Sequence, residues 1–194
     1  MSLKLGVLIS GGGTNLQAII DSIQSGELDA TIEVVISNRK GAYGLTRADE
    51  AGIPAVYIGK ANYPNEEERN EVLSQILESH DVQLVVLAGY LSILSVDLIR
   101  KFERHIINIH PSLIPKYCGE GFYGHHVHDA VIANGESSSG VTTHYVDEGV
   151  DTGEIIFQVE VPVFKSDTAD DLAARVLIEE HKLLIETIKT FIIN

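Results

Sequence analysis

The feature that most constrains the fold is a regular alternation between short apolar runs and longer segments with helical periodicity. The apolar runs are nearly continuous in Val, Ile and Leu, which is typical of strands buried on both faces of a parallel sheet. Helices must then connect successive strands by right-handed crossovers and cover the sheet. The expected strands are residues 3–10, 31–37, 55–58, 82–88 and 105–110, and the expected helices between them are residues 15–25, 43–51 and 65–79.

This order predicts an α/β fold of the Rossmann-like type, a doubly wound, mostly parallel sheet of about seven strands with helices on both faces. Two further strands, over residues 140–146 and 154–163, and a closing helix over residues 168–192 with Asp167 as its N-cap complete the fold. A chain of 194 residues, 44% of them hydrophobic, can bury one sizeable core. We therefore expect residues 1–194 to form a single domain.

The composition disfavours several classes of partner. The formal net charge is −14, from 28 acidic and 14 basic residues, which argues against nucleic acid or an anionic membrane as the main partner. The one cysteine, Cys118, excludes an intramolecular disulfide and suits a reducing compartment. The apolar run at the N-terminus is too short to span a bilayer and leads into a glycine-rich turn, so we expect neither a signal peptide nor a membrane span. The sequence thus predicts a cytoplasmic protein.

Two polar side chains end the fifth expected strand, in the stretch HIINIHPSLIPKYCG over residues 105–119. Asn108 and His110 are two residues apart, so both point to the same face of the strand. Ligand sites of doubly wound sheets lie at the carboxyl ends of the strands. An imidazole there can act as a general acid, and a carboxamide can donate a hydrogen bond to a developing oxyanion. These two residues are therefore candidates for catalysis, with a satisfied polar strand end as the alternative.

A glycine-rich segment, SGGGTNLQ over residues 10–17, lies between the first strand and the first helix. Glycines allow a sharp turn, and the free amides at the start of a helix bind phosphate. Gly11 and Gly13 fit the dinucleotide fingerprint, but its third glycine would fall on Leu16, and the lysine of a Walker loop is also missing. The segment therefore predicts a small phosphorylated ligand rather than a dinucleotide. The alternative is an ordinary tight turn.

Carboxylates in the second half of the chain are further candidates. The loop DEGVDTG offers Asp147, Glu148 and Asp151 near the same sheet edge, and spacing alone does not choose among them. A carboxylate close to His110 would raise the pKa of that histidine and favour its charged form at neutral pH. In the last helix Glu180 falls inside an apolar stripe, so it is either a ligand anchor or part of a structural pair. The stripe consists of Leu172, Val176, Leu183, Leu184, Ile188 and Phe191.

Three histidines, His125, His126 and His128, follow Cys118 in a segment that the sequence predicts to be a loop. Their spacing matches no recognised set of metal ligands. A functional metal is therefore not expected.

Taken together, these segments resemble the phosphoribosylglycinamide formyltransferase family, the folate-dependent enzymes of purine biosynthesis. The resemblance covers nearly the whole chain and rests on SGGGTNLQAII, ISNRKGAYGLTRA, VVLAGYLSILS, INIHPSLIPKY, GVTTHYVDEGVDTG and the final EEH. The NIHPSLIP run is shared with methionyl-tRNA formyltransferase and formyltetrahydrofolate deformylase. Each of those carries an additional domain that 194 residues do not accommodate.

The resemblance implies a formyltransferase fold and direct transfer of the formyl group of 10-formyltetrahydrofolate, a co-substrate, to the amine of glycinamide ribonucleotide. It implies a tetrahedral oxyanion stabilised by Asn108 and by protonated His110, with Asp151 holding that charge and a proton passing toward N10 through water. No metal and no covalent enzyme intermediate are implied. The expected partners are small molecules, and the expected state is a monomer or homodimer.

The resemblance also assigns the other candidate residues, position by position. The residues that correspond to the ribonucleotide site are Gly13, Thr14, Asn15 and Glu180. Those that correspond to the folate site are Leu91, Ser92, Ile93, Leu94, Asn108 and Asp147, and His144 corresponds to a supporting position.

The chain departs from the family pattern in two places. Many members have an arginine near the start of the third helix that meets the folate tail, where this chain has Asn65, Glu66 and Glu67; Arg69, one turn later, is the candidate substitute. The segment over residues 118–128 is longer than in some members and is expected to reshape the loop over the substrate.

Three other functions fit the sequence less well. A different formyltransferase, or a deformylase that transfers the formyl group to water, would release tetrahydrofolate without the ribonucleotide. A non-catalytic nucleotide- or folate-binding module would bind without turnover, but it leaves Asn108, His110 and Asp151 unexplained. A nicotinamide dehydrogenase is least favoured, because the third fingerprint glycine is missing.

Overall fold

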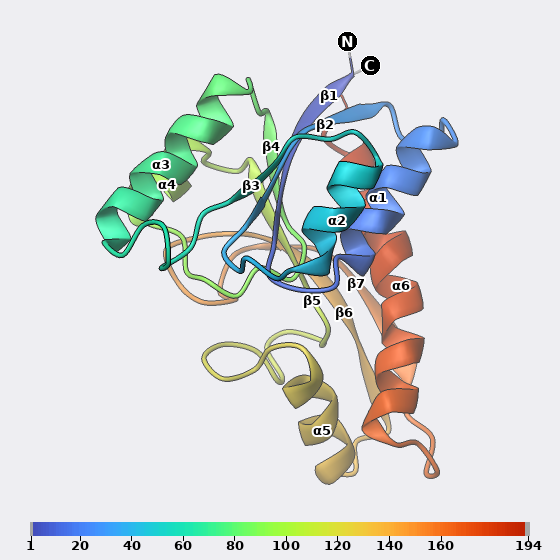
Figure 1. Cartoon of the computed structure of the whole chain (residues 1–194). Helices are drawn as coiled ribbons and strands as arrows, with labels where there is room; N and C mark the ends of the chain where they lie inside the picture. The colour runs from blue at the N-terminus through green and yellow to red at the C-terminus, as the bar shows by residue number, and fades with distance from the viewer. Residues whose placement is uncertain (1, 193–194) are drawn as a thin grey trace.

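The computed structural model describes residues 2–192 and contains one seven-stranded sheet with helices on both faces (Figure 1). The strands are β1 (Leu3–Ile9), β2 (Ala30–Ser37), β3 (Ala55–Tyr57), β4 (Leu84–Leu87), β5 (Ile106–His110), β6 (Ser138–Tyr145) and β7 (Ile155–Pro162). The helices are α1 (Thr14–Gln24), α2 (Tyr43–Glu50), α3 (Glu66–Ser79), α4 (Val96–Lys101), α5 (His125–Ala133) and α6 (Ala169–Lys189). The predicted doubly wound, mostly parallel α/β fold is confirmed.

The strand order in the sheet is β3-β2-β1-β4-β5-β6-β7. The first five strands of this order, β3, β2, β1, β4 and β5, are parallel to their neighbours. β6 pairs antiparallel with β5, and β7 pairs antiparallel with β6. The direction of winding reverses between β1 and β4, which is where open α/β sheets bind their ligands. The loops that follow β1, β4 and β5 all lie along this edge, at the lower side of the sheet in Figure 1.

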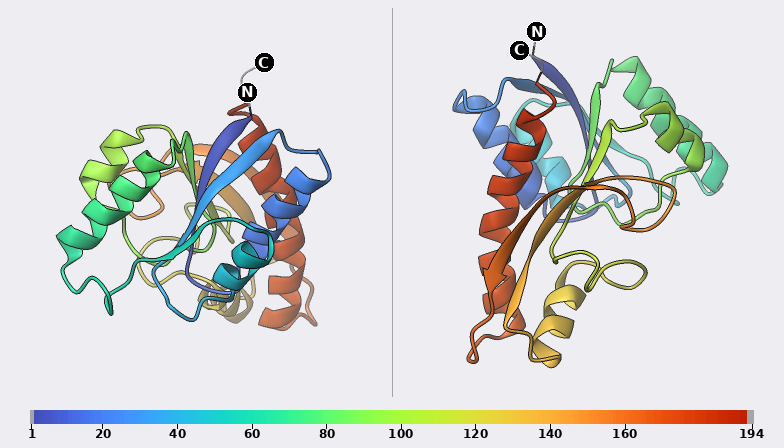
Figure 2. Two further views of the ribbon diagram at one scale, coloured as in Figure 1. Left: turned by 45° about the horizontal axis from the view of Figure 1, so that its top comes forward. Right: turned by 180° about the vertical axis from the view of Figure 1, so that it is seen from behind.

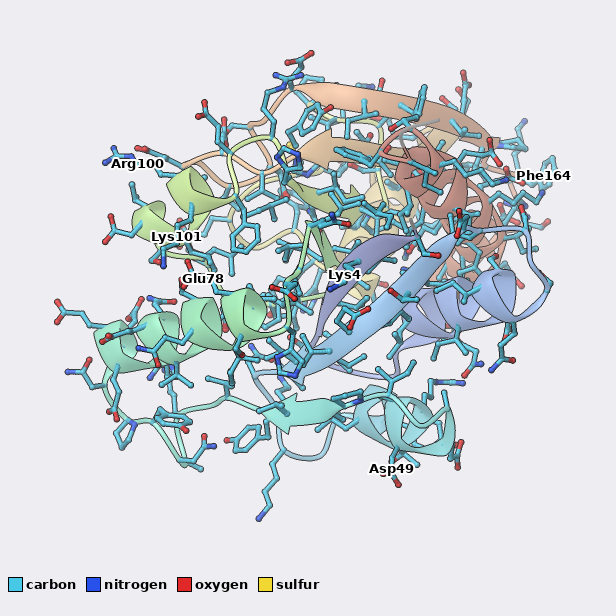
Figure 3. The ribbon with its side chains drawn as sticks, turned by 90° about the horizontal axis from the view of Figure 1, so that it is seen from above. Lys4, Asp49, Glu78, Arg100, Lys101 and Phe164 are labelled. Atoms are coloured by element: carbon cyan, nitrogen blue, oxygen red, sulfur yellow. The ribbon has the colours of Figure 1, made fainter. Side chains whose placement is uncertain are left out.

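Each face of the sheet is covered by its own apolar cluster. On one face α1 and α6 contribute buried residues such as Leu16 and Leu184, and Figure 2 shows α6 running along β6 and β7. On the other face α3 contributes Leu77. Figure 3 shows Glu78 of α3 and Lys101 of α4 lying between these two helices, where they form an ion pair at 2.7 Å. The near-continuous apolar strands are thus buried from both sides, as a parallel sheet requires.

The start of α6 differs from the prediction. Its N-cap is Thr168, not Asp167. The Thr168 hydroxyl accepts the amide of Asp171 at 3.2 Å, and the Asp171 carboxylate accepts the amide of Thr168 at 2.9 Å, which forms a capping box. Asp167 instead accepts hydrogen bonds from Arg175 at 2.6 and 2.9 Å, so its carboxylate is not available to the helix end. The helix also ends earlier than expected, before Phe191.

Two helices, α4 and α5, were not expected from the sequence. The segment predicted as a loop around the three histidines forms the first turns of α5, in which Val127 and Val131 are both buried. These two valines have helical spacing, but the preceding glycines made the segment look like a loop. No helix within residues 2–192 is long and apolar enough to cross a bilayer.

Candidate active site

A cavity of about 460 Å³ opens at the carboxyl ends of β4 and β5. Its walls come from three segments: the chain after β4, the loop before α5, and the acidic loop between β6 and β7. The lining includes Leu91, Ser92, Ile93, Leu94, Asn108, His110, His144, Asp147 and Asp151. The structure therefore brings together all of the residues predicted for catalysis, folate binding and support, although they come from distant parts of the chain.

Asn108 and His144 lie side by side because they are partners in the antiparallel pairing of β5 with β6. His144 Nδ1 is 2.8 Å from the carbonyl oxygen of Tyr145, and a carbonyl only accepts, so Nδ1 carries a proton. In the neutral ring, His144 Nε2 then accepts a hydrogen bond from Asn108 Nδ2 at 3.1 Å. The same Asn108 nitrogen donates to Asp151 Oδ1 at 3.3 Å. Two acceptors therefore set the orientation of the carboxamide.

Asp151 connects the acidic loop to the strand end. Its Oδ2 accepts the amide of Gly119 at 2.9 Å and lies 3.6 Å from His110 Nδ1. Asp151 has a φ of 56°, in the left-handed region that few non-glycine residues adopt, so its backbone is held in an unusual conformation that aims the carboxylate. Burial, the largest effect, would raise the pKa of Asp151, but the Gly119 amide and the neighbouring His144 and His110 side chains together outweigh it, and the pKa is lowered.

The other two carboxylates of this loop have different partners. Asp147 accepts the hydroxyl of Thr152 at 2.6 Å and the amide of Gly149 at 3.1 Å, which stabilises the turn of the loop. Glu148 pairs with Arg100 at 2.9 Å on an exposed surface. The carboxylate beside His110 is thus that of Asp151, a choice that spacing alone left open.

His110 has a defined partner at each ring nitrogen. Its Nε2 lies 2.8 Å from the carbonyl oxygen of Tyr117 and therefore donates, while Nδ1 faces Asp151. Burial lowers the pKa of His110 below its ordinary value; the Tyr117 carbonyl and Asp151 act in the opposite direction without outweighing burial, and His144 adds to the lowering. The expected upward effect of a carboxylate on this pKa is therefore present, but burial outweighs it, so the pKa is lowered where the sequence predicted that it would rise. The side chain is only 5% exposed, which makes desolvation the largest effect.

The residues predicted for the ribonucleotide lie around the start of α1. Gly13 is the N-cap with a φ of 71°, and within the described residues no side chain caps the helix, so its first amides are free for an anion. Asn15 Nδ2 donates to Glu180 Oε2 at 2.8 Å, which brings α6 to this loop. Burial raises the pKa of Glu180, and the hydrogen bond from Asn15 opposes this only in part. Thr14 is exposed and lines a separate open groove of about 650 Å³ between α1 and α6.

Hydrogen bonds connect the loop after β1 to the loop after β4. Ser10 Oγ donates to Asn38 Oδ1 at 2.6 Å and accepts the amide of Leu91 at 2.8 Å. Asn38 Nδ2 donates to Ser92 Oγ at 2.6 Å. Sequence reasoning missed Ser10 and Asn38, although each directly follows an apolar strand, and that position was the available signal.

Other contributions had no signal in the sequence. Tyr117 and Gly119 act through a backbone carbonyl and a backbone amide, which any residue type provides. Arg69 donates to the carbonyls of Tyr63 and Pro64, so its contact with a folate tail stays a prediction.

Among the α5 histidines, His125 is paired with two aspartates. His125 contacts Asp129 at 3.3 Å and Asp170 at 2.7 Å. In the part of the chain that the structure covers, no three His, Cys, Asp or Glu side chains gather closely enough to hold a metal ion.

The fold and this arrangement of amide, imidazole and carboxylate define a formyl transferase domain, and the family model described as formyl transferase matches residues 3–188. The chain is 43% identical over 188 residues to the phosphoribosylglycinamide formyltransferase of Haemophilus influenzae. The aligned region covers 97% of this chain and 86% of that protein. The chain belongs to the phosphoribosylglycinamide formyltransferase family.

Two further comparisons agree with this assignment. The chain is 45% identical over 186 residues to the chloroplastic phosphoribosylglycinamide formyltransferase of Vigna unguiculata. The aligned region covers 96% of this chain but 60% of that relative. The crystal structure of glycinamide ribonucleotide transformylase 1 from Symbiobacterium toebii superposes with a TM-score of 0.91 at 40% identity, covering 100% of this chain and 91% of the other.

Proposed function

We propose that this protein transfers the formyl group of 10-formyltetrahydrofolate to the amine of glycinamide ribonucleotide, a step of de novo purine (IMP) biosynthesis. The observation that carries the proposal is the convergence of Asn108, His110 and Asp151 in the lining of one cavity, which the chain after β4 also lines. Family membership supports the same reaction, because the relatives are named for it.

The folate co-substrate is assigned to the cavity beside β5. Its volume lies in the range of sites that bind small molecules, roughly 300 to 1,000 Å³. Leu91 and Ile93 are 42% and 72% exposed on its wall, and such exposed apolar side chains are favourable where a ligand covers them. In this proposal they contact the pterin together with Leu94, while Asn108 and Asp147 supply polar contacts at the other end.

The ribonucleotide is assigned to the start of α1. The free amides after Gly13 suit its phosphate, and Glu180 can accept from a hydroxyl or amine of the ligand. Asn15 Oδ1 is buried and has no hydrogen-bond partner among the described residues. An unpaired buried acceptor is costly, so a donor on the ligand would relieve that cost.

The chemistry follows from the charge state of His110. The glycinamide amine attacks the formyl carbon, and the carbonyl oxygen becomes an oxyanion. Asn108 stabilises this oxyanion by donating to it the hydrogen bond that it otherwise donates to Asp151, the longer of its two hydrogen bonds. The new negative charge raises the pKa of the neutral His110 at that moment, so Nδ1 takes the proton from the attacking nitrogen. A proton then reaches N10, the bond between the carbon and N10 breaks, and tetrahydrofolate leaves. The charged histidine thus forms during the reaction instead of being present before it.

Several broader statements stay predictions. We take residues 1–194 as a single formyltransferase domain, supported by a sheet whose strands extend from Leu3 to Pro162 and by the packing of α6 against α1. A cytoplasmic location, a monomeric or homodimeric state and the lack of a metal requirement also stay predictions.

The test is a spectrophotometric assay of the folate product, with and without glycinamide ribonucleotide, on the native protein and on His110→Ala. We expect turnover that depends on the ribonucleotide and falls on the order of a hundredfold or more in the variant, as for loss of other oxyanion and proton-transfer groups. His80→Ala, at the end of α3, is the matched control and should retain activity.

The other outcomes of this assay are informative. Turnover that does not need the ribonucleotide would instead indicate transfer of the formyl group to water. No turnover by the pure native protein with both substrates would refute the proposed reaction.

A further inference from the structure

The backbone of Tyr117 is held in an unusual conformation beside the catalytic histidine. Its φ is 51°, in the left-handed region that is uncommon for a bulky residue. In this conformation its carbonyl oxygen accepts from His110 Nε2 at 2.8 Å. Such a conformation persists only where surrounding contacts hold it, so the contacts of the Tyr117 side chain matter.

Those contacts lead to Glu136, in the turn between α5 and β6. Tyr117 Oη donates to Glu136 Oε1 at 2.9 Å. Lys116 Nζ lies 3.2 Å from both carboxylate oxygens of Glu136. Behind them Ser112 Oγ donates to the Lys116 carbonyl at 2.6 Å, which fixes the chain just before Tyr117. A carboxylate from a separate turn therefore anchors the segment that carries the carbonyl.

We propose that Tyr117 and Glu136 are positioning residues. The hydrogen bond between their side chains fixes the Tyr117 carbonyl, and this carbonyl keeps the proton of neutral His110 on Nε2. Nδ1, on the Asp151 side of the ring, is then left free to exchange protons during the reaction. This inference rests on the proposed function, because it assigns a role in that reaction.

The surroundings of His110 show why the Tyr117 carbonyl decides the tautomer. The titratable groups that face the ring are Asp151 and His144 from the β6 side and His128 from α5. Asp151 lies on the Nδ1 side. Among the described residues, the hydrogen-bond partner of Nε2 is the Tyr117 carbonyl. Without it, a proton on Nδ1 facing Asp151 becomes the favoured neutral form.

The consequence for the reaction is direct. A His110 ring with its proton on Nδ1 has no lone pair on the nitrogen that faces Asp151, which is the nitrogen that accepts the proton in the proposed reaction. It cannot take the proton that the attacking amine must lose before tetrahydrofolate leaves. Binding of either substrate does not require this lone pair, so the defect should appear in kcat and not in KM.

The test compares Tyr117→Phe, Glu136→Leu and Glu136→Gln with the native protein. We expect Tyr117→Phe and Glu136→Leu to lower kcat about tenfold, with KM for both substrates unchanged, because small misplacements of a catalytic group are costly. Glu136→Gln keeps an oxygen that can accept from Tyr117 and should retain most of the activity. Lys116→Met is the matched control, since it removes the ion pair but leaves the bond between Tyr117 and Glu136.

A second readout does not depend on activity. Nitrogen-15 NMR of the His110 ring distinguishes a proton on Nε2 from one on Nδ1, and it also reports whether the site of each variant is folded. We expect the native ring to carry its proton on Nε2 and Tyr117→Phe to move part of the population to Nδ1. Glu136→Gln should resemble the native protein.

Two results would overturn the inference. One is an unchanged His110 tautomer and unchanged kcat in Tyr117→Phe; the other is a loss in Lys116→Met as large as that in Tyr117→Phe, which would assign the anchoring to the ion pair. Failure of the proposed function would look different. The native protein would then show no ribonucleotide-dependent turnover, while the NMR comparison would still decide how the ring is held.

Discussion

At the scale of residues, the site separates the charge states of two neighbouring groups. Asp151 is held ionised, because its lowered pKa reflects donors that outweigh its burial. His110, 3.6 Å away, is held neutral, because burial lowers its pKa. Titratable groups whose pKa values are pushed apart in this way are typical of acid–base sites. The same desolvation that keeps the ring neutral makes its pKa sensitive to any charge that forms in the cavity.

This arrangement predicts the pH dependence of the rate. Because neutral His110 accepts the proton, kcat should fall as the pH drops through a pKa that lies below the ordinary 6.5. Asp151→Asn removes a charge that raises this pKa, so the acidic limb should move to lower pH. We also expect kcat to fall on the order of a hundredfold, because the charged His110 that forms during the reaction loses its carboxylate partner. Rate profiles and NMR titration of His110 would measure both effects.

The matched control for this variant is Glu148→Gln, which changes a carboxylate of the same loop that pairs with Arg100 on the surface. It should leave the rate profile unchanged. An Asp151→Asn protein with the native His110 titration would contradict the electrostatic account.

At this scale, a site residue could be predicted where the period of a strand or helix determines the direction of its side chain. The period of a strand places Asn108 and His110 on one face, and so both were found. The charge state of His110 depends on how deeply it is buried, and its partner on Nε2 is a backbone oxygen; neither has a side-chain pattern.

At the scale of elements, the contact between the loop after β1 and α2 shapes the proposed phosphate site. The amide of Gly44 donates to the carbonyl of Gly11 at 3.0 Å, and Arg47 Nε donates to the carbonyl of Gly12 at 2.8 Å. These bonds turn the loop carbonyls toward α2. A Cβ added to Gly13 would lie 2.7 Å from the Cα of Gly44, so the two segments approach closely only because both residues are glycines.

Gly13→Ala should therefore harm both stability and binding. Its φ of 71° disfavours a side chain, and the clash is with backbone that cannot move aside easily. We expect the free energy of unfolding to fall by more than about 1 kcal/mol and the ribonucleotide KM to rise, with the folate KM little changed. Denaturant unfolding and steady-state kinetics would measure these. For stability the control is Gly12→Ala, where an added Cβ meets nothing within 4 Å; equal destabilisation by both changes would contradict the account.

The elements were predictable where the local sequence has a clear periodic pattern. The buried strands and the long helices have periodic patterns over many residues, and they were found with ends shifted by a few residues. The six-residue α4 and the nine-residue α5 were missed. The glycines before α5 made that segment look like a loop, and the six residues of α4 are too few to show a helical period.

At the scale of the whole molecule, the last helix contributes Glu180 to the proposed ribonucleotide site at the first loop. Asn15 and Glu180 are 165 residues apart in sequence and 2.8 Å apart in space. Burial of the Glu180 carboxyl raises its pKa above the ordinary 4.5. The folded state therefore retains a proton at pH values where the unfolded chain has released it, and stability from this group is present at low pH and lost as the pH rises through the folded pKa.

Glu180→Gln should reverse that loss while damaging function. The amide oxygen can still accept from Asn15, but it no longer carries a charge that burial disfavours. We expect the variant to unfold at a higher temperature than the native protein at about pH 8 and at a similar temperature at about pH 4, while its ribonucleotide KM rises.

Thermal unfolding at both pH values and steady-state kinetics would decide this prediction. Glu179→Gln is the control, because that carboxylate forms a surface pair with Lys182. A native protein that is more stable than Glu180→Gln at the higher pH would contradict the sign argued here.

The position of Glu180 has a consequence for the chain as it is being made. Synthesis proceeds from the N-terminus, and domains fold as units once enough of the chain has emerged. The glycine-rich loop leaves the ribosome early, but its partner on α6 follows only after every strand of the sheet has been translated. A nascent chain that has been translated only through β5 therefore carries the glycine-rich loop and His110 but still lacks Glu180, so the proposed ribonucleotide site can form only when synthesis of α6 is nearly complete.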